Sequence, residues 1–264
     1  MPAPPRADGL HTTSYGDSGP LVVFCHGLFG QGKNWTGIAK ELAADHRVLL
    51  VDMPHHGRSA WSDSFDYLDA ADQVAGLFSE DDPVALVGHS MGGKIAMLAA
   101  LRHPARVERL CVVDVSPVRY EHTAEFVRFI DGMKALDLDS LEQRHEASSH
   151  LEEWVPDRTI RSFLLQNLRR HEDDWSWQIN LEVLGRDLLE IGDWPDDRLP
   201  GDASYDGPVL WMAGQNSPYV RDEYAEPMDR WFPRNRRVTI KDAGHWVHSE
   251  QPEVFVEVLR RFLT

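Results

Sequence analysis

The residues Gly88-His89-Ser90-Met91-Gly92-Gly93 are the most informative in the sequence about its fold, because they join a strand pattern directly to a helix pattern. The apolar run Val84–Val87 before it predicts a buried strand, and Met91–Arg102 predicts a helix. Only a sharp turn connects them this closely, and the glycines two residues before and after Ser90 permit it because they lack a Cβ atom. We therefore expect the Ser90 hydroxyl to stand above the carboxyl end of the strand.

Strand and helix patterns alternate on both sides of this turn. Buried strands are predicted at Leu21–His26, Arg47–Asp52, Val84–Val87, Val107–Asp114, Val209–Ala213 and Val238–Lys241, and helices at Trp35–Leu42, Tyr67–Phe78, Met91–Arg102 and Pro252–Leu263. Such alternation is typical of an α/β fold with a mostly parallel sheet and helices on both faces. No strand pattern appears between Val118 and Asp206. The sequence thus predicts a core of residues 1–117 and 207–264 with a helical insertion at 118–206.

Composition narrows the class of protein. The chain has 264 residues, and its 43 acidic and 27 basic side chains give a net charge of −16, which disfavours nucleic acid as a partner. Its longest apolar runs, such as Leu21–Phe24, are too short to span a bilayer. The opening Met1-Pro2-Ala3-Pro4-Pro5-Arg6 has no apolar signal core behind it. We expect a soluble cytoplasmic protein.

No motif in the sequence predicts a metal or cofactor site. Cys25 and Cys111 each lie in an apolar run and are expected to be small buried hydrophobic residues rather than a disulfide. His55 and His56 are adjacent, so on an extended chain they point in opposite directions and cannot easily share an ion. No phosphate-binding loop and no glycine-rich dinucleotide motif follows a strand.

Ser90 needs a base, because a serine hydroxyl is a poor nucleophile until its proton is removed. His245 follows the strand Val238–Lys241 and precedes the last helix, so it emerges at the same sheet edge as Ser90. The preceding Ala243-Gly244 step gives its loop the freedom to reach Ser90. His248 is the alternative base, although it lies where the closing helix begins.

The base in turn needs an acid, which in this arrangement lies between the serine and the histidine in the chain. After the strand Val209–Ala213, Ser217 stands where an aspartate is usual. Asp114 ends the earlier strand, and a carboxylate there is costly unless it pairs with a cation or imidazolium. We predict Asp114 as the acid; a role for it in capping the turn before Pro117, with Asp222 as the acid instead, is the alternative.

Backbone N–H groups are expected to bind the oxyanion. The loop after the first strand supplies one, assigned to Leu28 with Phe29 as the alternative, and Met91 supplies the other. His26, Asp52 and His56 are expected to brace these loops rather than to react. An apolar pocket for an acyl group is predicted from Phe29, Met91, Trp154, Trp175, Trp177, Tyr219 and Trp246.

Together these motifs resemble the α/β-hydrolase superfamily, and within it the YbfF-type esterases, which act on acyl esters and acyl-CoA thioesters. The matching segments are HGLFGQGKNW (26–35), VDMPHHGRS (51–59), GHSMGGKIAM (88–97), VVDVSPVRY (112–120), GQNSPYV (214–220) and AGHWVHSEQP (243–252). Pro54 departs from the pattern, since similar sequences tend to have arginine there. The resemblance implies Asp114 as the acid, a helical cap over the site, and strands for Cys25 and Cys111 that are not neighbours.

The residues and the resemblance together predict a cofactor-independent serine hydrolase. Its expected partner is a small-molecule acyl ester or thioester, cleaved through an acyl-enzyme intermediate. Another activity of the same superfamily, such as a C–C bond hydrolase, lactonase or perhydrolase, is the first alternative. A non-catalytic ligand-binding protein is the second, and an intact set of Ser90, Asp114 and His245 argues against it.

Overall fold

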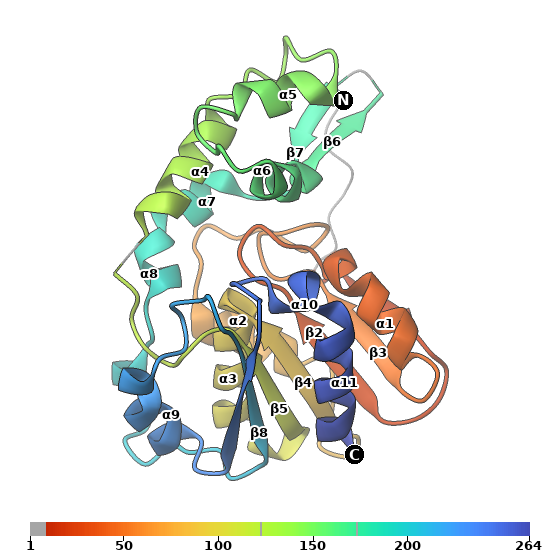
Figure 1. Ribbon diagram of the computed structural model, residues 1–264, viewed down its shortest axis with the longest axis vertical. Helices are drawn as coiled ribbons and strands as arrows, with labels where there is room; N and C mark the ends of the chain where they lie inside the picture. The colour runs from red at the N-terminus through yellow and green to blue at the C-terminus, as the bar shows by residue number, and fades with distance from the viewer. Residues whose placement is uncertain (1–8, 122, 173) are drawn as a thin grey trace.

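The computed structural model describes residues 9–121, 123–172 and 174–264, and a seven-stranded sheet forms its centre (Figure 1). The strand order is β1 (Thr12–Tyr15), β3 (Arg47–Val51), β2 (Leu21–Cys25), β4 (Val84–His89), β5 (Val107–Val113), β8 (Val209–Gly214) and β9 (Asn235–Ile240). Only β1 runs antiparallel to its neighbour. The predicted mostly parallel sheet is therefore confirmed. The proline-rich opening lies outside the described residues.

Helices cover both faces of the sheet, as the alternating pattern predicts. α2 (Tyr67–Ala75), α3 (Met91–Arg102) and α9 (Ala225–Trp231) cover one face, and α1 (Thr36–Leu42) and α11 (Pro252–Leu263), preceded by the short α10 (Val247–Glu250), cover the other. Short 3-10 helices lie at Gly32–Trp35, Pro104–Arg106, Leu165–Asn167, Asp196–Arg198 and Asp222–Tyr224. In β2, Val23 packs with the α2 and α3 side, whereas Val22 and Phe24 pack with Trp35 on the opposite side.

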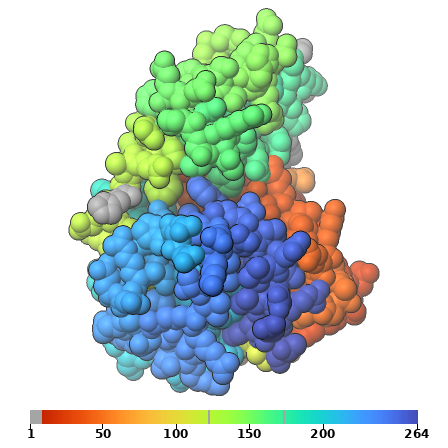
Figure 2. Space-filling view, in the orientation of Figure 1, coloured from red at the N-terminus to blue at the C-terminus, as the bar shows by residue number. Residues whose placement is uncertain are grey.

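Most of residues 118–206, here called the inserted segment, lies beyond the carboxyl ends of the parallel strands (Figure 1). Its last part runs back along the core, where the Tyr205 hydroxyl donates to the carbonyl oxygen of Val107 at the start of β5. The inserted segment forms α4 (Ala124–Lys134), α5 (Arg144–His150), α6 (Arg158–Leu164), α7 (Leu181–Arg186), α8 (Leu188–Gly192) and a hairpin of β6 (Leu168–His171) and β7 (Asp174–Trp177). In the space-filling view most of the segment is a green lobe resting on the orange and blue lobe of the core (Figure 2).

The expectation that the inserted segment holds no strand is wrong, because β6 and β7 form a hairpin there. Its stability depends on cross-strand contacts, such as the Arg170 guanidinium over the ring of its partner Trp175, which no apolar alternation signals. The edge strand β1 was not predicted either, because its polar sequence Thr12-Thr13-Ser14-Tyr15 is largely exposed.

The strand order explains several sequence expectations. Cys25 on β2 and Cys111 on β5 flank β4, and both are buried free thiols. Burial raises the pKa of the Cys25 thiol to about 12, so it stays protonated at neutral pH. Among the described residues, no helix combines the length and apolar character needed to cross a membrane, and the cytoplasmic location stays a prediction.

Candidate active site

Ser90 occupies the strained turn between β4 and α3. Its backbone has a φ of +53° and a ψ of −123°, a conformation that residues other than glycine rarely adopt. A Cβ atom on Gly88 would lie 2.3 Å from the Gly92 carbonyl oxygen, and one on Gly92 would lie 2.4 Å from that of His26. The glycines expected on either side of Ser90 are therefore required by the packing of backbone against backbone.

Three side chains from distant parts of the chain meet above the carboxyl edge of the sheet. The His245 Nε2 atom lies 3.0 Å from Ser90 Oγ, and its Nδ1 atom lies 2.7 Å from Asp114 Oδ2. Asp114 is completely buried, and the His245 side chain is 13% exposed. With Nδ1 donating to the carboxylate, Nε2 is left to accept the serine proton.

The Asp114 carboxylate is held by donors besides the imidazole. The Gly214 amide donates to Oδ1 at 2.9 Å, and the Ser217 hydroxyl donates to Oδ2. Ser217, at the position where an aspartate is usual, thus supports the carboxylate on the neighbouring strand end. Asp222 lies exposed in the 3-10 helix Asp222–Tyr224 and makes no hydrogen bond to His245 within the described chain.

The loop that carries His245 is fixed by contacts that the sequence did not predict. The His89 Nε2–H donates to the His245 carbonyl oxygen at 2.8 Å. The Glu250 carboxylate accepts from the Gly244 amide at 2.8 Å and from the Trp246 amide at 3.1 Å, on either side of the histidine. These bonds set the backbone position from which the imidazole reaches both partners.

His248, the alternative base, has a packing role instead. Its ring stacks on Trp35 with centroids 4.1 Å apart. Burial lowers the pKa of His248 to about 3, which keeps it neutral beside His245.

The two backbone amides predicted to bind an oxyanion are those of Leu28 and Met91. Neither the Leu28 nor the Met91 N–H donates a hydrogen bond to any described residue. Met91 is the first residue of α3, so the helix dipole also favours negative charge there. The Phe29 amide is unavailable, because it donates to His56 Nε2 at 3.2 Å.

Two buried histidines brace the loop that carries Leu28. His26 Nδ1–H donates to the Gly27 carbonyl oxygen at 2.8 Å, and its Nε2 accepts from the Met53 amide at 2.9 Å. His56 donates to the Pro54 carbonyl oxygen at 2.8 Å. Asp52 completes the brace by accepting from the Gly32 amide at 2.7 Å and the Arg58 amide at 3.0 Å. The expected structural role of these residues is confirmed.

This brace predicts that the protein loses stability in mild acid. Burial lowers the pKa of His26 to about 4 and that of His56 to about 3, against 6.5 when exposed. Below pH 6.5 these histidines bind protons in the unfolded chain but stay neutral in the folded one. The unfolding free energy should therefore fall by up to about 1.4 kcal/mol for each histidine per unit decrease in pH. Chemical denaturation at pH 6.5 and pH 5 measures the fall, and His56→Gln should flatten it. An equal unfolding free energy at the two pH values would contradict the assignment.

Two small cavities open at Ser90. One, of about 50 Å³, is lined by Ser90 and Met91 together with Tyr67, Lys94, Tyr120, Phe126, Leu188, Ile191 and Tyr219, among others. The second, of about 20 Å³, is lined by Ser90 and His245 together with Phe29, Phe126, Phe129, Phe163 and Trp246, among others. Phe29, Met91, Tyr219 and Trp246 therefore lie where the sequence suggested. Residues of the inserted segment line part of both cavities.

The prediction for the three other pocket residues needs correction. Trp154, Trp175 and Trp177 line neither cavity at Ser90. Trp154 packs on Gly132 of α4, Trp175 lies under an arginine, and Trp177 pairs with Leu168 in the hairpin. Phe126, Phe129 and Phe163, which were not among the predicted pocket residues, line the site instead. The helical pattern could not show which apolar face meets the core.

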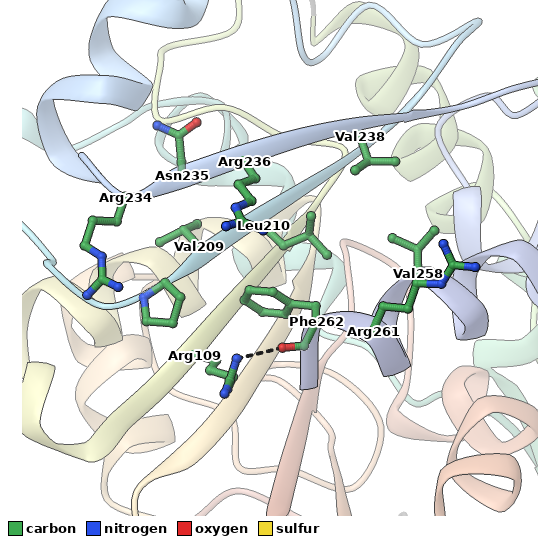
Figure 3. Close-up of a pocket in the computed structure, with 11 residues that line it drawn as sticks. Arg109, Val209, Leu210, Arg234, Asn235, Arg236, Val238, Val258, Arg261 and Phe262 are labelled. Carbon is green, nitrogen blue, oxygen red and sulfur yellow. Dashed lines mark hydrogen bonds between the residues drawn. The ribbon is translucent and has the colours of Figure 1, made fainter. Parts of the chain in front are cut away.

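A much larger cavity lies at the opposite edge of the sheet. It has a volume of about 630 Å³ and is lined by Arg109, Arg234, Arg236 and Arg261 around an apolar floor (Figure 3). Arg109 Nη1 donates to the Phe262 carbonyl oxygen at 2.9 Å there. Because β8 and β9 begin at this edge, the cavity is remote from Ser90. Among the described residues, no group of three His, Cys, Asp or Glu side chains could hold a metal ion.

Comparison with known proteins agrees with the observed fold. The family model described as alpha/beta hydrolase fold matches residues 20–252. The chain is 39% identical to the sn-1-specific diacylglycerol lipase ABHD11 of Mus musculus, over 92% of this chain and 81% of the relative. It is 32% identical to the esterase YbfF of Escherichia coli K12, over 92% of each chain. A solved structure titled marine microorganism esterase has a TM-score of 0.91 and 32% identity, over 96% of this chain and 99% of the other.

Proposed function

From the premise that the chain belongs to the α/β-hydrolase family and is an esterase-type enzyme, we propose that it cleaves carboxylic esters and acyl thioesters through Ser90, His245 and Asp114. The observation that supports this most is the continuous chain of hydrogen bonds from the Ser90 hydroxyl through the imidazole to a buried carboxylate. The reaction needs no cofactor, because these groups supply the nucleophile, the base and the acid.

In the first half of the reaction, Ser90 Oγ attacks the acyl carbonyl carbon while its proton passes to His245 Nε2. The Asp114 carboxylate stabilises the imidazolium through the bond to Nδ1. The Leu28 and Met91 amides donate to the oxyanion of the tetrahedral intermediate. When the intermediate collapses, the alcohol or thiol leaves with the proton from Nε2, and the acyl group stays on Ser90.

In the second half, a water molecule takes the place of the alcohol. His245 removes a proton from it, and the resulting hydroxide adds to the acyl-enzyme carbonyl. The second tetrahedral intermediate uses the same two amides. Its collapse releases the carboxylic acid and returns the proton to Ser90.

The inserted segment, residues 118–206, acts in this proposal as a cap on the core of residues 1–117 and 207–264. Its apolar side chains Phe126, Phe129 and Phe163 face Ser90 across the cavities. They offer an apolar wall for an acyl chain and exclude water from the reacting carbonyl.

A fluorophosphonate probe tests the activated serine directly. The wild-type protein should form one covalent adduct at pH 8, because the phosphorus centre captures a serine that has a base and an oxyanion site. Mass spectrometry of the digested protein should place the adduct on the peptide that contains Ser90, and His245→Ala should slow labelling. An unlabelled wild-type protein, or an adduct on another serine, would count against the proposal.

A further inference from the structure

Lys94 is a buried cation in the wall of the cavity at Ser90. It lies in the first turn of α3, and its backbone amide donates to the carbonyl oxygen of Ser90, the residue before the helix, at 3.1 Å. The residue is only 1% exposed, and it lines the 50 Å³ cavity together with Ser90. The catalytic mechanism proposed above gives this side chain no part.

The ammonium of Lys94 has no carboxylate partner among the residues that the structure describes. Its Nζ donates to the carbonyl oxygens of Gly192 at 2.9 Å and Asp193 at 2.6 Å, which leaves one of three N–H donors unused among the described residues. No carboxylate oxygen of the described residues lies within 4.0 Å of Lys94 Nζ, the limit for an ion pair. The Asp193 carboxylate accepts instead from the Trp194 amide at 2.9 Å and lies 3.9 Å from Arg119.

The surroundings of Lys94 supply little negative charge. The rings of Tyr120 and Tyr67 lie 4.8 and 5.9 Å from Nζ, and burial raises the pKa of both phenols, so both are neutral. Burial also lowers the pKa of Lys94 to about 7, with Asp193 as the charge that opposes the shift. A desolvated cation of this kind favours an anion as its third partner.

We propose that Lys94 binds a carboxylate at the far end of a short acyl group, so that the substrates are half-esters or half-thioesters of small dicarboxylic acids. This inference rests on the proposed function of Ser90. The small volume of the cavity favours a chain of a few carbons, and Phe126, Leu188 and Ile191 would pack against its methylene groups. A chain of net charge −16 repels anions in general, so such a preference requires a local cation.

A purely structural role makes a different prediction. The bonds of Lys94 to Gly192 and Asp193 tie the end of α8 to α3, and a tether alone would affect every ester equally. Matched substrates therefore distinguish the two roles. Monomethyl succinate and monomethyl glutarate carry a carboxylate where methyl butanoate and methyl pentanoate carry a methyl group.

The test compares kcat/KM for each matched pair at pH 6.5, with methanol release as the readout. Wild-type protein should prefer the carboxylated ester of at least one pair by roughly 10- to 100-fold, the range of a charge-assisted hydrogen bond. Lys94→Met should remove that preference. Lys134→Met, which deletes an ion pair with Glu182 on the surface of the inserted segment, should keep it.

Each outcome bears on one proposal. A wild-type ratio near one, or a ratio that Lys94→Met leaves intact, would overturn the role of Lys94 while Ser90-dependent hydrolysis of methyl butanoate still supports the proposed function. Hydrolysis that survives Ser90→Ala would instead refute the proposed function. If Lys94→Met does not fold, inhibition of the wild-type enzyme decides: succinate or glutarate should inhibit at about tenfold lower concentration than the matched monocarboxylate, and equal inhibition would overturn the inference.

Discussion

Replacing Ser90 with alanine is expected to lower kcat for ester hydrolysis by about 10⁶-fold, because the nucleophile, base and acid act as one unit. The hydroxyl that His245 deprotonates would be gone, so no acyl-enzyme could form. Residual hydrolysis would come from polarisation of the carbonyl by the Leu28 and Met91 amides. Steady-state hydrolysis of methyl butanoate measures the loss.

Ser149→Ala is the matched control for that substitution. Ser149 lies exposed on α5, where its hydroxyl donates to the His145 carbonyl oxygen at 3.2 Å, and its loss should leave kcat unchanged. A Ser90→Ala protein that keeps more than about a hundredth of the wild-type kcat would rule out Ser90 as the nucleophile.

Asp114→Asn is expected to lower kcat by about 10⁴-fold while the protein stays folded. An amide at this position can donate to Nδ1 of His245, which would place the imidazole proton on Nε2 and leave no base for Ser90. It would also weaken the support from Gly214 and Ser217, since their donors need an acceptor. The pH–rate profile and the thermal unfolding midpoint, measured together, separate lost chemistry from lost structure.

Asp222→Asn provides the comparison, because Asp222 is the alternative acid. It lies exposed and makes no hydrogen bond to His245 within the described residues, so kcat should change less than twofold. Full activity in Asp114→Asn with a large loss in Asp222→Asn would move the acid to the later loop.

The distances within the site follow from the topology more than from any single motif. β4, β5, β8 and β9 are consecutive in the sheet, and the loops after them carry Ser90, Asp114, Ser217 and His245. Order along the chain predicted that these loops share one edge. It could not predict that Ser217 donates to Asp114, because that bond depends on how two neighbouring loops bend toward each other.

Local sequence patterns were enough to predict the α/β architecture, the sharp turn at Ser90 and the candidates His245 and Asp114. These features depend on local patterns, namely apolar strands, helical periodicity and glycines beside a serine. Three other features became visible in the folded chain: which aromatic side chains of the inserted segment line the site, the hydrogen bond that occupies the Phe29 amide, and the burial of Lys94 beside the cavity with no carboxylate partner among the described residues. The physical reason is that burial and hydrogen-bond partners come from segments distant in the chain, whose approach no local pattern encodes.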